Sequence, residues 1–149
     1  MSHTYTNVAI HALFATKVRQ PWLTNEIRTG LFAYMAGIVK RLGAKPLIVG
    51  GYSDHVHLLF VLPARLPLAD LMEKIKANSS KWLHEQRPSL RNFAWQTGYA
   101  AFSVSQSNLG KVRSYIAMQE EHHRKMTYRD EVTALLRKHG IEPDPRFER

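Results

Sequence analysis

Apolar residues recur along the chain with two different periods, and their succession predicts a mixed α+β domain. Runs that alternate every second residue, or are apolar on both faces, indicate strands over residues 5–16, 45–49, 55–62 and 93–105. Apolar positions spaced three or four residues apart indicate helices over residues 25–42, 67–86, 109–125 and 127–139. The order along the chain is therefore β-α-β-β-α-β, followed by helices.

Turn and capping residues support these boundaries. The glycines and the Ser53-Asp54 pair between the second and third strands are typical of a hairpin. Thr127 with Asp130 three residues later resembles a capping box in which Asp replaces Glu. In residues 93–105, a turn at Thr97-Gly98 separates two short strand-like runs.

This order of elements predicts a ferredoxin-like fold, the split βαβ or RRM-like arrangement. Such a fold is an antiparallel sheet with helices on one face, here followed by C-terminal helices. The length of 149 residues suits one domain. We expect a core over about residues 5–126 and a C-terminal helix and tail over about residues 127–149.

The charge balance narrows the class of partner. Lys and Arg number 21 and Asp and Glu 12, which gives a net charge of +9 and a pI near 10.0. This excess favours a polyanion, most simply a nucleic acid, although a basic protein without such a partner is an alternative.

The composition also excludes several classes of protein. The chain has no cysteine, which excludes disulfides, thiolate metal sites and a cysteine nucleophile. We see no signal peptide and no apolar run near the roughly 18–20 residues of a membrane span. We therefore expect no membrane association and a cytoplasmic location.

The first candidate chemistry is the pair His55 and His57. Residues two apart on a strand point to the same face of the sheet, so the two imidazoles lie side by side. They form either a hydrogen-bonded core pair or half of a site for a divalent cation. A metal site would need a third donor from elsewhere in the chain.

The second candidate is the pair Tyr115 and Gln119, spaced i, i+4 and so on one face of a helix. The amide oxygen of Gln119 can ligate a hard cation, and a nearby tyrosine could then attack a phosphorus atom. The alternative is ordinary packing of Tyr115 beside a solvated Gln119.

Five blocks of the sequence, in order and spacing, resemble the single-tyrosine HUH transposases of bacterial insertion sequences, which include the hairpin-recognising REP-associated transposases. The likeness extends from about residue 5 to about residue 142. The blocks cover residues 15–21, 51–59, 79–82, 95–99 and 115–123.

This resemblance implies a set of site residues. His55 and His57 would be metal ligands, Gln119 the third ligand, and Tyr115 the catalytic nucleophile on the C-terminal helices. The metal would be Mg²⁺ or Mn²⁺, with no nucleotide cofactor. The implied reaction is cleavage and rejoining of single-stranded DNA at insertion-sequence ends through a 5′-phosphotyrosine.

The resemblance also implies partners. These are single-stranded DNA with hairpins and a second copy of the chain, a homodimer in which the tyrosine helix can act in trans. The location would be the cytoplasm of a bacterium or archaeon, in association with the nucleoid.

Further residues are weaker candidates for supporting roles. Asp54 could orient His55 from behind, and His123 could be a ligand, a base near Tyr115 or a phosphate contact. Trp95 and Tyr99 could stack on bases, although aromatic residues in strands more often belong to the core. Five basic residues are candidate DNA contacts: Lys17, Arg19, Arg113, Arg124 and Lys125.

Two other functions compete with strand transfer. One is a non-catalytic or domesticated nucleic-acid-binding module on the same fold. The other is a phosphohydrolase with a histidine nucleophile, but Leu59 stands where a third alternating histidine would be needed. The second His-x-Ser/Thr strand motif of two-histidine phosphoesterases is also missing from the sequence.

Overall fold

A four-stranded antiparallel sheet forms the centre of the structure, a computed structural model that describes residues 3–123 and 125–144. The strands lie in the order β2-β3-β1-β4, which is the order of the split βαβ arrangement, so the predicted fold is confirmed. Their bounds are β1 (Val8–Ala15), β2 (Lys45–Gly51), β3 (His55–Leu62) and β4 (Ala100–Val104).

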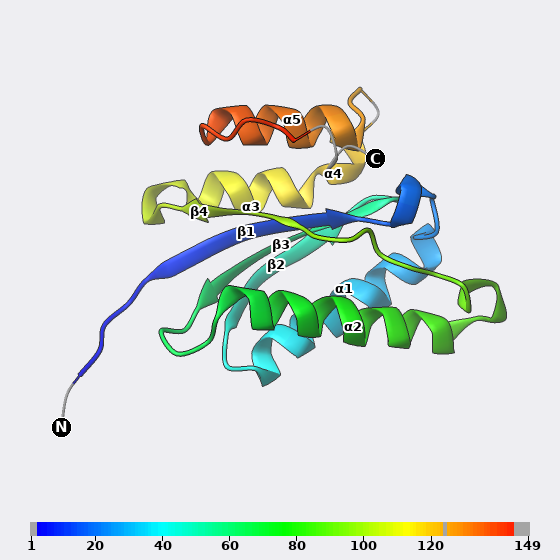
Figure 1. Ribbon diagram of the computed structural model, residues 1–149, viewed down its shortest axis with the longest axis horizontal. Helices are drawn as coiled ribbons and strands as arrows, with labels where there is room; N and C mark the ends of the chain where they lie inside the picture. The colour runs from blue at the N-terminus through cyan, green and yellow to red at the C-terminus, as the bar shows by residue number, and fades with distance from the viewer. Residues whose placement is uncertain (1–2, 124, 145–149) are drawn as a thin grey trace.

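Helices cover both faces of this sheet (Figure 1). The two crossover helices, α1 (Asn25–Arg41) and α2 (Leu68–Gln86), lie on one face. The C-terminal helices α3 (Leu109–Ala117), α4 (Gln119–His122) and α5 (Tyr128–Lys138) lie on the opposite face. The candidate site residues on β3 therefore lie beneath the C-terminal helices.

The central strand β1 is apolar on both faces because each face is covered. Ile10, Ala12 and Phe14 belong to the large core beneath α1 and α2. Leu13 and Ala15 point the other way and belong to a smaller core against α5. This second core anchors α5 to the sheet.

Two predicted elements differ from the structure. Residues 93–105 contain one strand, β4, and a single bridge between Trp95 and Thr16. The bridge does not extend into a strand, because Lys76 Nζ occupies the backbone carbonyls of Gln96 and Gly98. The Trp95 ring packs edge-on against Phe14, and its Nε1 donates to Ser79 at 3.0 Å. Base stacking by Trp95 is thus incompatible with its burial in the core.

The predicted helix over residues 109–125 is interrupted. Met118 leaves the helical conformation at φ −106° and ψ 24°, so α3 ends at Ala117 and α4 continues only to His122. The apolar spacing correctly predicts the helical residues of α3. Hydrophobic periodicity cannot reveal a break at a single residue such as Met118.

The start of α5 follows the predicted capping pattern. The side-chain oxygen of Thr127 accepts a hydrogen bond from the backbone N–H of Asp130 at 3.2 Å. This cap fixes where the helix begins, and residues of its first turn then face the sheet. Within the described part of the chain, we find no helix long and apolar enough to span a membrane.

Candidate active site between α3 and α5

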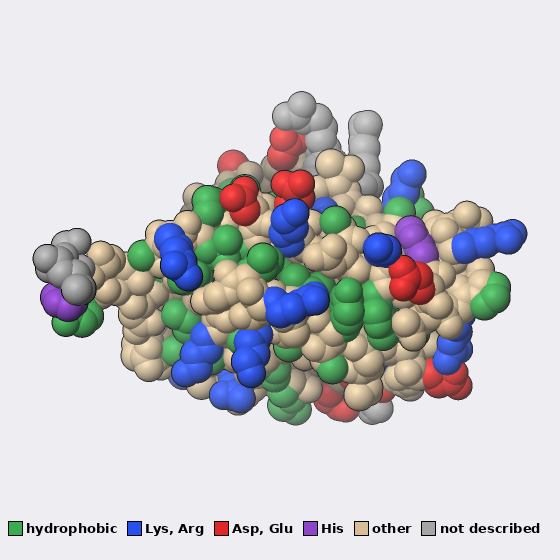
Figure 2. All heavy atoms as spheres, turned by 90° about the horizontal axis from the view of Figure 1, so that it is seen from below, with side chains coloured by type: hydrophobic (Ala, Val, Ile, Leu, Met, Phe, Trp, Pro, Cys, Tyr) green, Lys and Arg blue, Asp and Glu red, His purple; other side chains and the backbone are tan. Residues whose placement is uncertain are grey.

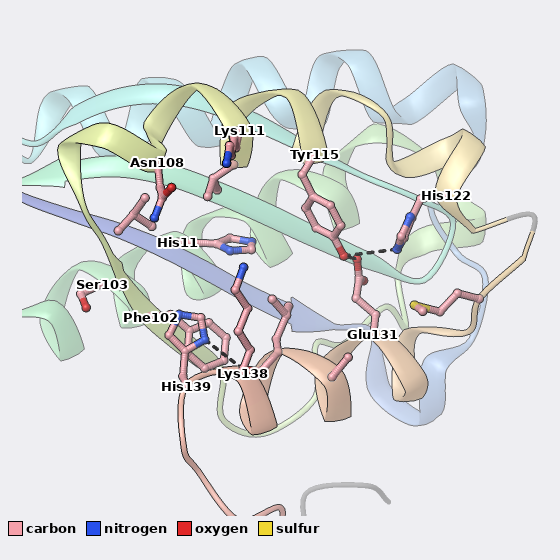
Figure 3. Close-up of a pocket in the computed structure, with 15 residues that line it drawn as sticks. His11, Phe102, Ser103, Asn108, Lys111, Tyr115, His122, Glu131, Lys138 and His139 are labelled. Carbon is pink, nitrogen blue, oxygen red and sulfur yellow. Dashed lines mark hydrogen bonds between the residues drawn. The ribbon is translucent and has the colours of Figure 1, made fainter.

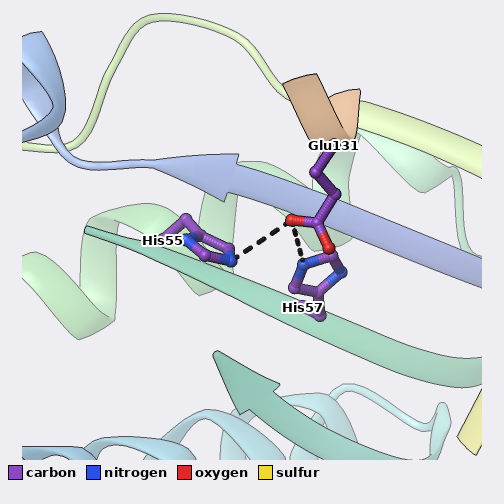
Figure 4. A group of neighbouring side chains, drawn as sticks. All are labelled: His55, His57 and Glu131. Carbon is purple, nitrogen blue, oxygen red and sulfur yellow. Dashed lines mark hydrogen bonds and ion pairs between the residues drawn. The ribbon is translucent and has the colours of Figure 1, made fainter. Parts of the chain in front are cut away.

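The two histidines of β3 lie on the sheet face beneath the C-terminal helices, and both are fully buried. Glu131 reaches down to them from the first turn of α5 (Figure 4). Its Oε1 lies 3.1 Å from Nε2 of His57 and 3.4 Å from Nε2 of His55. The three side chains form a cluster whose ligand atoms all lie within 4.8 Å of one another.

The outer nitrogen of each imidazole is held by a neighbour. Nδ1 of His55 donates to Asp54 Oδ1 at 2.8 Å. Nδ1 of His57 lies 2.8 Å from Nε2 of His11, a buried histidine on the adjacent strand β1. The Nε2 atoms of both imidazoles are therefore aimed into the space beneath α3 and α5.

Gln119 enters the same space from the start of α4. Its Oε1 lies 2.9 Å from Nε2 of His55, and its Nε2 donates to Glu131 Oε2 at 3.0 Å. With the Nδ1 proton held by Asp54, the Nε2 lone pair of His55 faces the oxygens of Gln119 and Glu131. Lone pairs that converge in this way are the donor set that a cation coordinates.

Tyr115 completes the site from the last turns of α3. Its hydroxyl donates to Glu131 Oε2 and lies 3.4 Å from Nε2 of His122. The ring centroids of Tyr115 and His57 are 5.9 Å apart. The two oxygens of Glu131 thus face different groups, Oε1 the imidazoles and Oε2 the phenol and Gln119.

Burial and Glu131 set the ionisation of the cluster. Burial lowers the pKa of His57 to about 4 and that of His11 to about 3, so both imidazoles are neutral at pH 7. Burial alone would raise the pKa of Glu131, but hydrogen bonds from His123 and His57 outweigh it and lower that pKa. Burial, reinforced by the hydrogen bond to Glu131, raises the pKa of Tyr115 well above 10.0.

The weaker candidates lie in three places. His123 Nε2 is 3.0 Å from Glu131 Oε1, so it joins the cluster. Arg19 and Lys125 border a hollow of about 570 Å³ beside Asp54. Lys17 is exposed at the end of β1.

One of the remaining basic candidates lies away from the site. Arg113 is exposed two residues before Tyr115, and this spacing places it on the opposite side of α3. Arg124 lies outside the described residues.

Glu131 and His11 are site residues that the sequence patterns did not single out. An acidic residue in the first turn of a helix is ordinary, because it interacts favourably with the helix dipole. A lone histidine in an apolar strand is equally unremarkable. Pairing β1 with β3 places His11 on the same face of the sheet as His55 and His57, and this pairing is what could have identified His11 as a site residue.

Comparison with known proteins identifies relatives for most of the chain. Residues 4–119 match the family described as "Transposase IS200 like". The chain is also similar to the transposases for insertion sequence element IS200 of Salmonella typhimurium (strain LT2) and Salmonella typhi. Each is 28% identical over 127 residues, which cover 81% of this chain and 82% of the relative. The family match includes Tyr115 and Gln119 but ends before Glu131.

Two solved structures share the fold. One is a crystal structure of a candidate transposase from Deinococcus radiodurans R1, with a TM-score of 0.63 and 22% identity over 80% of this chain and 96% of that chain. The other is a REP-associated tyrosine transposase bound to a REP hairpin, with a TM-score of 0.58 and 16% identity. It aligns over 83% of this chain and 74% of that chain.

Proposed function

Because the chain belongs to the IS200-like transposase family, we propose that it cuts and rejoins single-stranded DNA with Tyr115 as the nucleophile. The observation that carries this proposal is the position of the Tyr115 hydroxyl. It touches Glu131, whose other oxygen contacts the two histidines of β3. These contacts support a role for Tyr115 as nucleophile, with a proton acceptor and candidate metal ligands beside it in the same chain.

The proposed reaction exchanges one phosphodiester for another. The phenolic oxygen of Tyr115 attacks phosphorus, and the bond from phosphorus to the 3′ oxygen breaks as the new bond forms. The phenolic proton passes to Glu131 Oε2, and the departing 3′ oxygen takes up a proton to become a free hydroxyl. Attack by a 3′-hydroxyl on the 5′-phosphotyrosine reverses these steps and releases Tyr115. The number of phosphodiester bonds is unchanged, so no nucleotide cofactor is needed.

The donor set fits a divalent metal. His55, His57, Gln119 and Glu131 would hold it, with two imidazole nitrogens and two oxygens. A mixed set of this kind suits Mn²⁺ as well as Mg²⁺. When bound, the metal supplies positive charge beside the scissile phosphate and makes the phenolate of Tyr115 less costly to form.

Charge and relatives support hairpin-bearing DNA as the substrate. One structural relative is bound to a REP hairpin, which supports a hairpin-bearing substrate for this chain. The net charge of +9 favours a polyanion, and Lys and Arg side chains are scattered over the outer face of α1 and α2 (Figure 2). Beside the site, Arg19 and Lys125 border the hollow next to Asp54 and are placed to hold phosphates.

A non-catalytic binding module on the same fold is the second candidate, because fold and charge suit it equally well. The buried cluster around Glu131 favours the enzyme. A binding module has no need for a tyrosine hydroxyl that contacts a carboxylate among buried histidines.

A covalent-adduct assay tests the proposal. The protein is incubated with Mn²⁺ or Mg²⁺ and labelled single strands that carry hairpins from the DNA flanking its gene. We expect a labelled protein band on a denaturing gel, lost in Tyr115→Phe and after chelation of the metal. Tyr34→Phe, which changes a tyrosine of α1 whose ring stacks on Trp82, serves as the control. Absence of an adduct with every flanking hairpin, or an adduct that survives in Tyr115→Phe, contradicts the proposal.

A further inference from the structure

A cavity of about 440 Å³ extends from the Tyr115 hydroxyl along the groove between α3, β4 and α5 (Figure 3). Tyr115, His122 and Glu131 border its inner end, and His11 lies at its floor. The reaction proposed above uses only this inner end. The remainder of the cavity has no assigned role.

Aromatic rings follow one another along the cavity. His11 lies next to Tyr115, with ring centroids 6.3 Å apart, and Phe102 follows His11 at 6.4 Å. His139 then stacks on Phe102, at 4.3 Å and an interplanar angle of 21°. The row leads outward from the nucleophile, and the His11 imidazole in it is buried.

Polar and cationic side chains surround this apolar row. Asn108 and Lys111 lie on the α3 side, and Lys138 extends into the cavity from the α5 side (Figure 3). An aromatic wall with amide donors and acceptors and two cations at its edge matches a nucleotide, whose base is flat and whose phosphate is anionic. An aliphatic ligand would leave the polar groups unused, and a free phosphate would leave the rings unused.

We propose that this cavity binds the base of a nucleotide next to the phosphate that Tyr115 attacks. The inference rests on the proposed function, because the cavity opens on the Tyr115 hydroxyl. A base held here would fix the phosphate in line with the phenol and make cleavage depend on the identity or presence of that base.

An abasic scan tests the pocket. Each nucleotide within three positions of the mapped cleavage site is replaced in turn by an abasic residue, outside the hairpin. We expect one position at which loss of the base slows adduct formation about tenfold or more, as removal of a stacked base does elsewhere. Equal rates at every position overturn the proposal.

Two variants that fill the cavity test whether this base binds there. Ala134→Trp fills it from α5, where Ala134 is exposed, and Asn108→Trp fills it from α3, where the Asn108 side chain makes no capping bond. We expect either variant to slow cleavage of intact DNA to the rate of the abasic strand. Removal of the base should then have no further effect. Ala69→Trp, exposed on α2 beyond the sheet, is the matched control.

The outcomes separate this inference from the proposed function. Hairpin affinity and thermal unfolding are measured for each variant, so that only folded proteins are compared. If removal of the base still slows adduct formation to the full extent in both folded variants, the base does not bind in this cavity. Cleavage by Tyr115 is then unaffected by that result. If no adduct forms with any intact strand, the result contradicts the proposed function and, with it, the base pocket that depends on it.

Discussion

At the scale of single residues, Glu131 links every reactive group of the site. Its Oε1 contacts His55, His57 and His123, and its Oε2 contacts Tyr115 and Gln119. The family resemblance implies Gln119 as the third metal ligand, and the structure adds a charged oxygen beside it. Because a carboxylate binds a divalent cation more strongly than an amide does, Glu131 should contribute more to metal affinity.

We therefore expect Glu131→Ala to weaken Mn²⁺ binding at least about tenfold, and more than Gln119→Ala does. Titration calorimetry on the free protein measures both. Glu120→Ala, an exposed acidic residue of α4, should bind Mn²⁺ like the wild type. Unchanged affinity in Glu131→Ala, together with loss of binding in Gln119→Ala, would leave Gln119 as the ligand and Glu131 outside the metal site.

His11 is expected to act on the metal through His57. In the structure Nε2 of His57 donates to Glu131, so its Nδ1 accepts from His11. If Nε2 held a metal, Nδ1 would carry the proton and would donate to His11 instead of accepting from it. A partner at position 11 must therefore both donate and accept.

His11→Phe should lower Mn²⁺ affinity about 10- to 100-fold, because Nδ1 of His57 loses its partner. His11→Gln keeps one donor and one acceptor and should recover part of the loss. Calorimetry with circular dichroism as the folding check distinguishes the two. Equal affinities for the Phe and Gln variants would show that the hydrogen bond has no role in metal binding.

Whether a site residue could be predicted depends on how far it lies in the sequence from the other site residues. His55 and His57, or Tyr115 and Gln119, are near neighbours, so strand and helix periods alone place each pair on one face. Glu131 reaches the pairs only through tertiary packing of α5. No local pattern encodes that contact.

At the scale of elements, the position of α3 depends on one glycine of β2. A side-chain carbon at Gly50 would lie 2.7 Å from the backbone oxygen of Ile116 and 2.9 Å from its Cγ2. Helix α3 therefore rests directly on the β2 backbone, and Tyr115 is the residue before the contact. The spacing between this helix and the sheet determines where the phenol lies.

Gly50→Ala should force α3 away from the sheet, cost about 1–3 kcal/mol of unfolding free energy, and slow adduct formation. Hairpin affinity should change little. Gly37→Ala is the control, because a side-chain carbon there meets no atom within 4 Å and alanine favours the helix. Denaturant unfolding and the adduct rate check both variants, and equal rates for Gly50→Ala and wild type would contradict this role for the contact.

The elements that the sequence predicted well are those bounded by clear turn residues. Strand β3 and helix α1 match their predicted ranges within a residue, because Ser53-Asp54 and Pro63 flank β3 and Gly43 follows the end of α1. The missing strand before β4 arises from tertiary contacts. Lys76, for example, donates to the carbonyls of Gln96 and Gly98, which occupies backbone groups that a hairpin would have paired.

At the scale of the whole molecule, one chain contains the complete cluster. Tyr115 contacts Glu131 of its own chain, and Glu131 contacts His57. The homodimer implied by the family resemblance stays a prediction. This geometry supports a tyrosine that acts in cis, even if two copies associate.

Mixing two inactive variants tests that arrangement. Tyr115→Phe lacks the nucleophile and His57→Ala lacks a metal ligand, so each should be inactive alone. If Tyr115 acts in cis, their mixture should form no adduct, because no chain holds both residues. Recovery of adduct in the mixture would show that the tyrosine serves the partner's site.

The central claim, that Tyr115 is the residue joined to DNA, is tested most directly by locating the covalent bond. Trypsin cuts after Arg113 and Arg124, so Tyr115 is the one tyrosine in the peptide of residues 114–124. The adduct is digested with nuclease and trypsin and sequenced by mass spectrometry. We predict a nucleotide attached to Tyr115 in this peptide. A nucleotide on Tyr128, in the peptide of residues 126–129, or on one of the site histidines would contradict the account.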